Sequence, residues 1–149
     1  MVFRGLAVFK VSSEQTGGAF SLAEQLLPEG VATPLHSQPQ DDETFYLLEG
    51  NLTFYLGDGR PLRASSGATV HVLKGAAHAY RVESETARML VLTTPQHERF
   101  FRAAGEPART RTLPRRGRPG TPRPREGSLL SIATRDTWLK KEVANFALT

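Results

Sequence analysis

Short apolar segments separated by turn-forming residues run through the first hundred residues, and this pattern constrains the fold more than any other feature of the sequence. Thr44–Leu48 and Leu52–Leu56 are rich in aromatic and aliphatic residues, and Glu49-Gly50-Asn51 separates them. The run Gly57-Asp58-Gly59-Arg60 is a hairpin signal, because Asp-Gly supplies the positive φ angles of a tight turn. Segments of this kind at a spacing of about ten residues predict an all-β sandwich or barrel.

Other segments extend this pattern along the chain. Residues that suit strands occur at 18–27, 69–73, 78–82 and 87–93. Residues 95–104 fit a short helix, with Phe100 and Phe101 as its apolar contacts. We expect His97, near the start of this helix, to be a surface residue or a local cap. Together these elements predict one barrel domain over residues 1–104.

The composition changes at residue 105. Residues 1–104 carry 9 basic and 11 acidic side chains, whereas residues 105–149 carry 10 basic and 4 acidic ones. The pI of about 9.8 is therefore a property of the C-terminal part. The barrel region gives no reason to expect nucleic acid as a partner.

Residues 105–127 contain five prolines, four glycines and seven arginines, and Leu113 is their one large apolar residue. Such a segment cannot bury a core, so we expect a linker or an extended arm. The apolar residues of 128–149 recur at a roughly helical spacing. This spacing predicts a C-terminal helical segment that packs on the barrel or on a partner subunit.

The chain has no cysteine, which excludes disulfides, thiolate metal sites and a cysteine nucleophile. No segment approaches the roughly 20 apolar residues of a membrane span, and the N-terminal residues lack the pattern of a secretory signal. We therefore expect a cytoplasmic protein without a membrane partner.

Three residues in the barrel region suit a metal site. Glu43 shares a strand face with Phe45 and Leu47, so its carboxylate is expected inside the barrel, where a lone charge is costly unless it is paired or binds a metal. His36 lies in the same cluster of the sequence as Glu43, and His78 lies in a second cluster further along the chain. Two histidines and one carboxylate suit a divalent ion such as Fe, Ni, Mn or Zn.

The same residues carry a family resemblance. Gly30, His36, Glu43 and Gly50 match the spacing G-x5-H-x-H-x3–4-E-x6-G, and a second cluster matches G-x5-P-x-G-x2-H-x3-N at Gly67, Gly75 and His78. These two clusters resemble the signature motifs of the cupin superfamily. Over residues 4–105 the chain is similar to the quercetin 2,3-dioxygenase-like single-domain cupins. The resemblance implies a double-stranded β-helix, that is a jelly-roll barrel, with one divalent metal ion held by His36, Glu43 and His78.

The sequence also departs from these motifs. Gln38 stands where the first motif has its second histidine, and Leu73 replaces the proline of the second. A glutamine amide oxygen is a weaker ligand than imidazole. Gln38 is therefore expected either as a weaker fourth ligand or as a hydrogen-bond donor beside the ligands.

A second set of residues is expected to line a substrate pocket: Phe45, Leu47, Phe54, Tyr80 and His71. An aromatic wall of this kind suits a flat aromatic substrate. His71 is out of phase with Val70 and Val72, so it could face a partner instead of the pocket.

These features predict a metal-dependent enzyme that acts on a small aromatic or polyketide-like molecule of secondary metabolism, with dioxygenase-like chemistry. Glu43 would then both ligate the metal and move a substrate proton. The alternatives are a cyclase or isomerase that uses the metal as a Lewis acid, and a cupin that only binds a small molecule. We expect a homodimer, because Trp138, Leu139, Val143 and Phe146 form an apolar patch on the predicted C-terminal helix.

Overall fold

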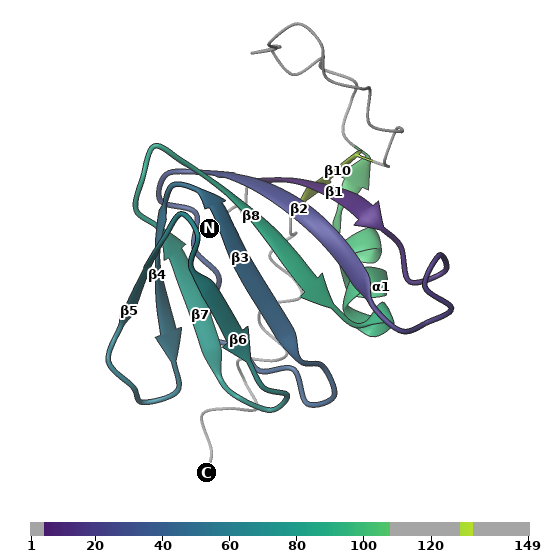
Figure 1. Ribbon diagram of the computed structural model, residues 1–149, viewed down its shortest axis with the longest axis horizontal. Coiled ribbons are helices and arrows are strands. Elements are labelled where there is room, and N and C mark those ends of the chain that lie inside the picture. The colour runs from purple at the N-terminus through teal and green to yellow at the C-terminus, as the bar shows by residue number, and fades with distance from the viewer. Residues whose placement is uncertain (1–4, 108–128, 133–149) are drawn as a thin grey trace, which may run out of the picture.

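The structure is a computed structural model that describes residues 5–107 and 129–132. Two antiparallel sheets face each other (Figure 1). The larger sheet contains, in spatial order, β6 (Thr69–Val72), β3 (Glu43–Glu49), β8 (Thr86–Thr93), β2 (Ser21–Pro28), β1 (Gly5–Val11), β10 (Leu129–Ile132) and β9 (Glu106–Pro107). The smaller sheet contains β5 (Leu62–Ser65), β4 (Asn51–Leu56) and β7 (His78–Val82). The predicted all-β jelly-roll barrel is confirmed.

The core lies between the two sheets and follows from alternation along the strands. On β3 the side chains of Glu43, Phe45 and Leu47 are buried, and the residues between them are not. On β4 the ring of Phe54 is fully buried, and it packs against Phe45 with 5.2 Å between the ring centroids. Full burial of one such ring contributes about 1.5–3 kcal/mol to folding.

The turn between β3 and β4 requires a glycine. Gly50 has a φ of 87°, which L-residues with a side chain rarely adopt. A Cβ atom at Gly50 would also lie 2.4 Å from the carbonyl oxygen of Thr86. The motif glycine at this position therefore has a structural reason, since it lets β3 turn sharply into the facing sheet.

The helix α1 (Pro95–Ala104) follows β8 directly and has the predicted boundaries. Side-chain contacts of Thr94, just before the helix, and of Glu98, in its first turn, attach the helix to the barrel. The hydroxyl of Thr94 donates to the carboxylate of Asp41. Glu98 accepts a 2.6 Å hydrogen bond from the backbone N–H of Ser13 and a 2.7 Å one from Nε of Arg102. Within the described part of the chain, no helix is long and apolar enough to cross a membrane.

The structure describes two short parts of the C-terminal region, and both are strands. Leu129–Ile132 form the strand β10 instead of the start of a helix, and Glu106–Pro107, placed in the linker, form β9. β10 pairs with β1 from Gly5 to Val8 and so satisfies the hydrogen-bonding groups of that edge. This tertiary pairing overrides the helical spacing. The remainder of the predicted arm and helix, including Trp138 and Phe146, lies outside the described residues.

The contacts of Glu98 predict a pH-dependent stability. Burial alone would raise its pKa, but the hydrogen bonds from Ser13 and the cation of Arg102 lower the pKa below its ordinary value of 4.5. A pKa that is lower in the folded chain means that ionised Glu98 stabilises the protein above about pH 4.5, and that this contribution is lost as the pH falls through the folded-state pKa.

We therefore expect Glu98→Gln to lower the free energy of unfolding by about 1–3 kcal/mol at pH 7 in urea titrations. The difference from the wild type should shrink steadily towards pH 3. Glu85→Gln, which alters an exposed carboxylate, should have little effect at either pH. A wild-type advantage that is equally large at both ends of this pH range would contradict the assignment.

Candidate metal centre

His36 and His78 become neighbours through backbone pairing. The segment that precedes β3 runs antiparallel to β7, and His36 and His78 form a bridge in which each backbone N–H donates to the carbonyl of the other, at 3.0 and 2.7 Å. Residues that oppose each other in this way place their side chains on the same face. The two imidazole rings accordingly lie 4.3 Å apart, centroid to centroid.

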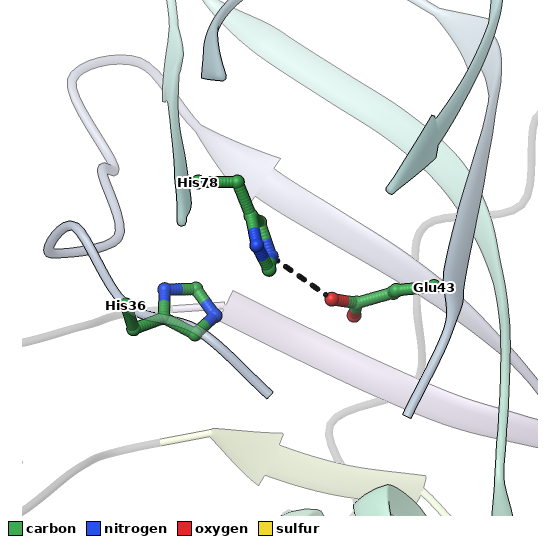
Figure 2. A group of neighbouring side chains, drawn as sticks. All are labelled: His36, Glu43 and His78. Atoms are coloured by element: carbon green, nitrogen blue, oxygen red, sulfur yellow. Dashed lines mark hydrogen bonds and ion pairs between the residues drawn. The ribbon is translucent and has the colours of Figure 1, made fainter. Parts of the chain in front are cut away.

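Glu43 approaches these rings from β3 in the facing sheet (Figure 2). Its Oε2 atom lies 3.2 Å from Nε2 of His78. One ligand atom from each of His36, Glu43 and His78 lies within 4.8 Å of the other two. Glu43 and His78 are buried, whereas His36 is half-buried. The structure thus brings together the three residues that the sequence singled out.

Backbone carbonyls fix the orientation of both imidazoles. Nδ1 of His36 lies 2.9 Å from the carbonyl oxygen of Pro34, and Nδ1 of His78 lies 3.1 Å from that of Ala76. A carbonyl oxygen only accepts hydrogen bonds, so each Nδ1 must carry a proton and donate it. In a neutral ring this leaves the lone pair on Nε2, which is the arrangement found in metal-binding histidines.

The contact between His78 and Glu43 needs a positive charge. The Nε2 lone pair of a neutral His78 would repel the carboxylate, so either the two groups share a proton or a cation lies between them. Burial lowers the pKa of His78, but the hydrogen bonds to Glu43 and Ala76 outweigh it and raise the pKa above its ordinary value. Two ligands at right angles around one ion, each at about 2.1 Å, would be about 3 Å apart. The observed 3.2 Å separation therefore also fits a shared divalent ion.

Gln38 joins the same group. Its Nε2 donates a 3.2 Å hydrogen bond to Oε2 of Glu43, and its Oε1 is buried without a hydrogen-bond partner. A half turn of the amide would exchange these two atoms and point the oxygen towards Glu43 and its neighbours. Both sequence-derived roles, weak ligand and hydrogen-bond donor, are sterically open to this side chain.

Four of the five predicted pocket residues lie in the barrel interior. The rings of Phe45, Phe54 and Tyr80 form one cluster, with centroid separations of 5.2 to 6.0 Å, and Phe45 meets the ring of His78 at 6.3 Å. Leu47 is also fully buried, but four residues of extended strand place it about 13 Å along β3 from Glu43. All four belong to the main hydrophobic core.

The prediction that His71 lines the pocket is wrong. On β6 the side chains of Val70 and Val72 are buried and that of His71 is exposed. Its Nδ1 lies 2.8 Å from the hydroxyl of Thr44 on the neighbouring strand. Strict alternation along the strand therefore turns His71 to the outer face of the sheet.

The expectation for His97 is also wrong, because this residue is buried beside the site. Its Nδ1 lies 3.4 Å from Oε1 of Glu43 and 3.1 Å from the hydroxyl of Thr93, and its ring stacks on Phe101. Burial lowers the pKa of His97 and outweighs the opposing effect of Glu43 and Asp41. A usable signal existed in the sequence, since Phe101 lies four residues after His97 and so shares its helix face.

Two polar residues of β2 were not singled out by the sequence either. Ser21 and Gln25 are buried with Ala23 and Leu27 on the inner face of the strand. Oε1 of Gln25 accepts a 3.4 Å hydrogen bond from the hydroxyl of Tyr80. Burial, and secondarily Glu43, raise the pKa of Tyr80, so its hydroxyl stays protonated and can donate.

Comparison with known proteins adds family evidence to this geometry. A family model described as a cupin domain matches residues 23–94. A quercetin 2,3-dioxygenase from Bacillus subtilis (strain 168) is 33% identical over 97 residues, which are 64% of this chain and 28% of that protein. The chain thus spans little more than a quarter of the curated relative that it matches.

Solved structures share the fold. The polyketide cyclase RemF from Streptomyces resistomycificus superposes with a TM-score of 0.57 at 22% identity, over 63% of this chain and 67% of the cyclase. An ectoine synthase from P. lautus gives a TM-score of 0.56 at 22% identity, over 62% of this chain and 65% of the synthase. With the two motifs and the jelly-roll barrel, the cupin-domain match over residues 23–94 supports membership of the cupin superfamily.

Proposed function

We propose that this chain is a metal-dependent enzyme that acts on a small aromatic or polyketide-like molecule, with quercetin 2,3-dioxygenase-like chemistry. One divalent ion, Fe, Ni, Mn or Zn, would be held by Nε2 of His36, Nε2 of His78 and the carboxylate of Glu43. The observation that carries this proposal is the convergence of these three donors inside the barrel, within 4.8 Å of one another.

The chain's own residues can be assigned roles around such an ion. The ion, when bound, would act as a Lewis acid or redox centre next to an oxygen atom of the substrate. Glu43 would hold it through Oε2, which already faces His78. Oε1 of Glu43 has two lone pairs, so it could accept a proton from a substrate hydroxyl while it keeps its contact with His97.

The interior beside the donors suits an aromatic molecule. Phe45, Phe54 and Tyr80 supply ring faces and edges next to His78, and they keep this side of the interior apolar. Gln25 and Tyr80 place polar groups within that wall and could meet a hydroxyl or carbonyl of the substrate. The name of the curated relative, a quercetin 2,3-dioxygenase, supports this substrate class.

Gln38 favours a second candidate, a cyclase or isomerase that uses the metal only as a Lewis acid. With an amide where the motif has an imidazole, the chain offers two histidines and one carboxylate as strong ligands. A Lewis acid needs no tuned redox potential, so it tolerates this weaker set. RemF, which shares the fold, is named as a polyketide cyclase.

The homodimer remains part of the proposal. The side chains of Tyr46 on β3 and Leu92 on β8 are 42% and 41% exposed on the outer face of the larger sheet. A dimer that pairs through this face would cover both side chains.

The metal assignment predicts specific losses. His36→Ala and His78→Ala should each reduce metal content about tenfold or more from one ion per chain, because each removes one of three strong ligands. The measurement is elemental analysis by mass spectrometry of protein purified without chelator. His71→Ala, which changes the histidine on the outer face, is the matched control and should keep its metal. Full retention in both ligand variants would refute the site.

Gln38→His should strengthen the site. An added imidazole that shares the face of His36 would supply a fourth strong ligand, so we expect affinity for Zn²⁺ or Ni²⁺ to rise about tenfold or more. Competition with a chromophoric chelator measures this change. Unchanged or weaker binding by a folded Gln38→His protein would show that the side chain does not face the ion.

Oxygen consumption separates the two chemistries. Metal-loaded protein is incubated with flavonol and polyketide candidates in an oxygen-electrode cell and, in parallel, without oxygen. Uptake of one O₂ per substrate supports the dioxygenase, whereas product formed equally well without oxygen supports the cyclase or isomerase. Tight substrate binding by metal-loaded protein with no turnover in either cell would contradict both and leave a small-molecule-binding cupin.

A further inference from the structure

His97 is brought to the centre by α1, which lies outside both sheets. The helix starts at Pro95, immediately after β8, so the histidine falls in its first turn. Only 6% of His97 is exposed, and its ring stacks on Phe101 at a centroid separation of 4.5 Å and an interplanar angle of 7°. The ring therefore has a fixed plane, and that plane directs Nδ1 towards Thr93 and Glu43.

The strand register explains why Nδ1 reaches the carboxylate. Thr44 is paired with Leu92, so the preceding residue Glu43 lies opposite Thr93, which is itself paired with Ser21 on β2. All three of these polar side chains point inward and are buried. His97 closes over this row, with Nδ1 at 3.1 Å from the Thr93 hydroxyl and 3.4 Å from Oε1 of Glu43.

The two oxygens of Glu43 have different neighbours as a result. Oε2 faces Nε2 of His78 and the amide of Gln38, both at 3.2 Å. Oε1 faces His97. A carboxylate oxygen can only accept a hydrogen bond, so a neutral His97 matches it as the tautomer that carries its proton on Nδ1. The contact then fixes the rotation of the carboxylate about its terminal bond.

The helix that carries His97 is anchored without any help from the metal-binding residues. Glu98 joins it to the backbone of Ser13, and the guanidinium of Arg102 lies 4.5 Å from the centroid of the Phe9 ring. The Thr94 hydroxyl ties its start to Asp41, two residues before Glu43. His97 is thus held by contacts that do not involve the proposed ligands, which is what a pre-organising residue requires.

We propose that His97 is a positioning residue for the metal centre: its Nδ1–H, shared between the Thr93 hydroxyl at 3.1 Å and Oε1 of Glu43 at 3.4 Å, orients the carboxylate so that Oε2 would face the ion shared with His36 and His78. The inference rests on the proposed metal-binding function and adds to it a fourth residue outside the motifs. Groups that orient a metal ligand in this way change metal affinity by about 10–100-fold when they are removed.

Two substitutions separate the hydrogen bond from the packing. His97→Phe keeps a ring to stack on Phe101 but removes the donor. His97→Asn loses the ring but retains a donor, because its amide nitrogen is as many bonds from Cα as Nδ1 of histidine. Gln96→Ala, at the exposed neighbouring position on the same helical turn, is the matched control.

Zn²⁺ affinity by chelator competition and the visible absorption of the Co²⁺-loaded protein are the readouts. We expect His97→Phe to bind Zn²⁺ about 10–100-fold more weakly, with altered Co²⁺ bands that report a changed ligand geometry. His97→Asn should stay within about threefold of the wild type with wild-type bands, and Gln96→Ala should be unchanged. Wild-type affinity in His97→Phe, or equal losses in both His97 variants, would overturn the role of the donor.

A measurement on the unmodified protein covers the case in which the phenylalanine variant does not fold. Nitrogen-15 NMR of the histidine rings distinguishes the two tautomers, and His97 should carry its proton on Nδ1. A proton on Nε2 alone would overturn the proposal. Failure of the metal centre itself is recognised separately, because the wild-type protein would then bind neither Zn²⁺ nor Co²⁺.

Discussion

The buried carboxylate of Glu43 is the constraint on which the interior of this barrel depends. An ionised carboxylate that is 4% exposed costs several kcal/mol unless partners compensate it. Here the partners come from three directions: His78 from the smaller sheet, Gln38 from the segment before β3, and His97 from α1. Of these three, only a protonated histidine carries a full positive charge, so a divalent ion beside the two Nε2 atoms is the simplest way to balance the group.

The sheet pairing, and not any local motif geometry, builds this arrangement. The bridge between His36 and His78 aligns two rings from different motifs, and the antiparallel neighbours of β3 turn Glu43 towards them. The glycines of the motifs contribute by shaping the turns, as Gly50 does between β3 and β4. The aromatic rings next to the site, of which Phe45 contacts the ring of His78, keep water from one side of the carboxylate.

The sequence could predict those parts of the fold and site that depend on period-two alternation and on spacing. Glu43 was expected inside the barrel because Phe45 and Leu47 share its face, and the structure places it there. The same rule places His71 out of phase with Val70 and Val72, and the structure turns it outward, so its alternative place in the pocket is wrong. The position of His97 next to Glu43 and the strand β10 were beyond the reach of such rules, although the spacing of His97 and Phe101 does indicate a shared helix face. The position of His97 depends on how α1 packs against the barrel. The strand β10 forms because residues distant in the sequence pair with the edge of β1.

The central claim is that His36, Glu43 and His78 hold one metal ion, and anomalous X-ray scattering tests it most directly. Crystals of the protein loaded with Zn²⁺ or Ni²⁺ would be measured on both sides of the metal absorption edge. We predict one strong anomalous peak per chain, about 2.0–2.2 Å from Nε2 of His36, from Nε2 of His78 and from a carboxylate oxygen of Glu43. A map with no peak at these residues, or with its main peak on the outer face at His71, would contradict the claim.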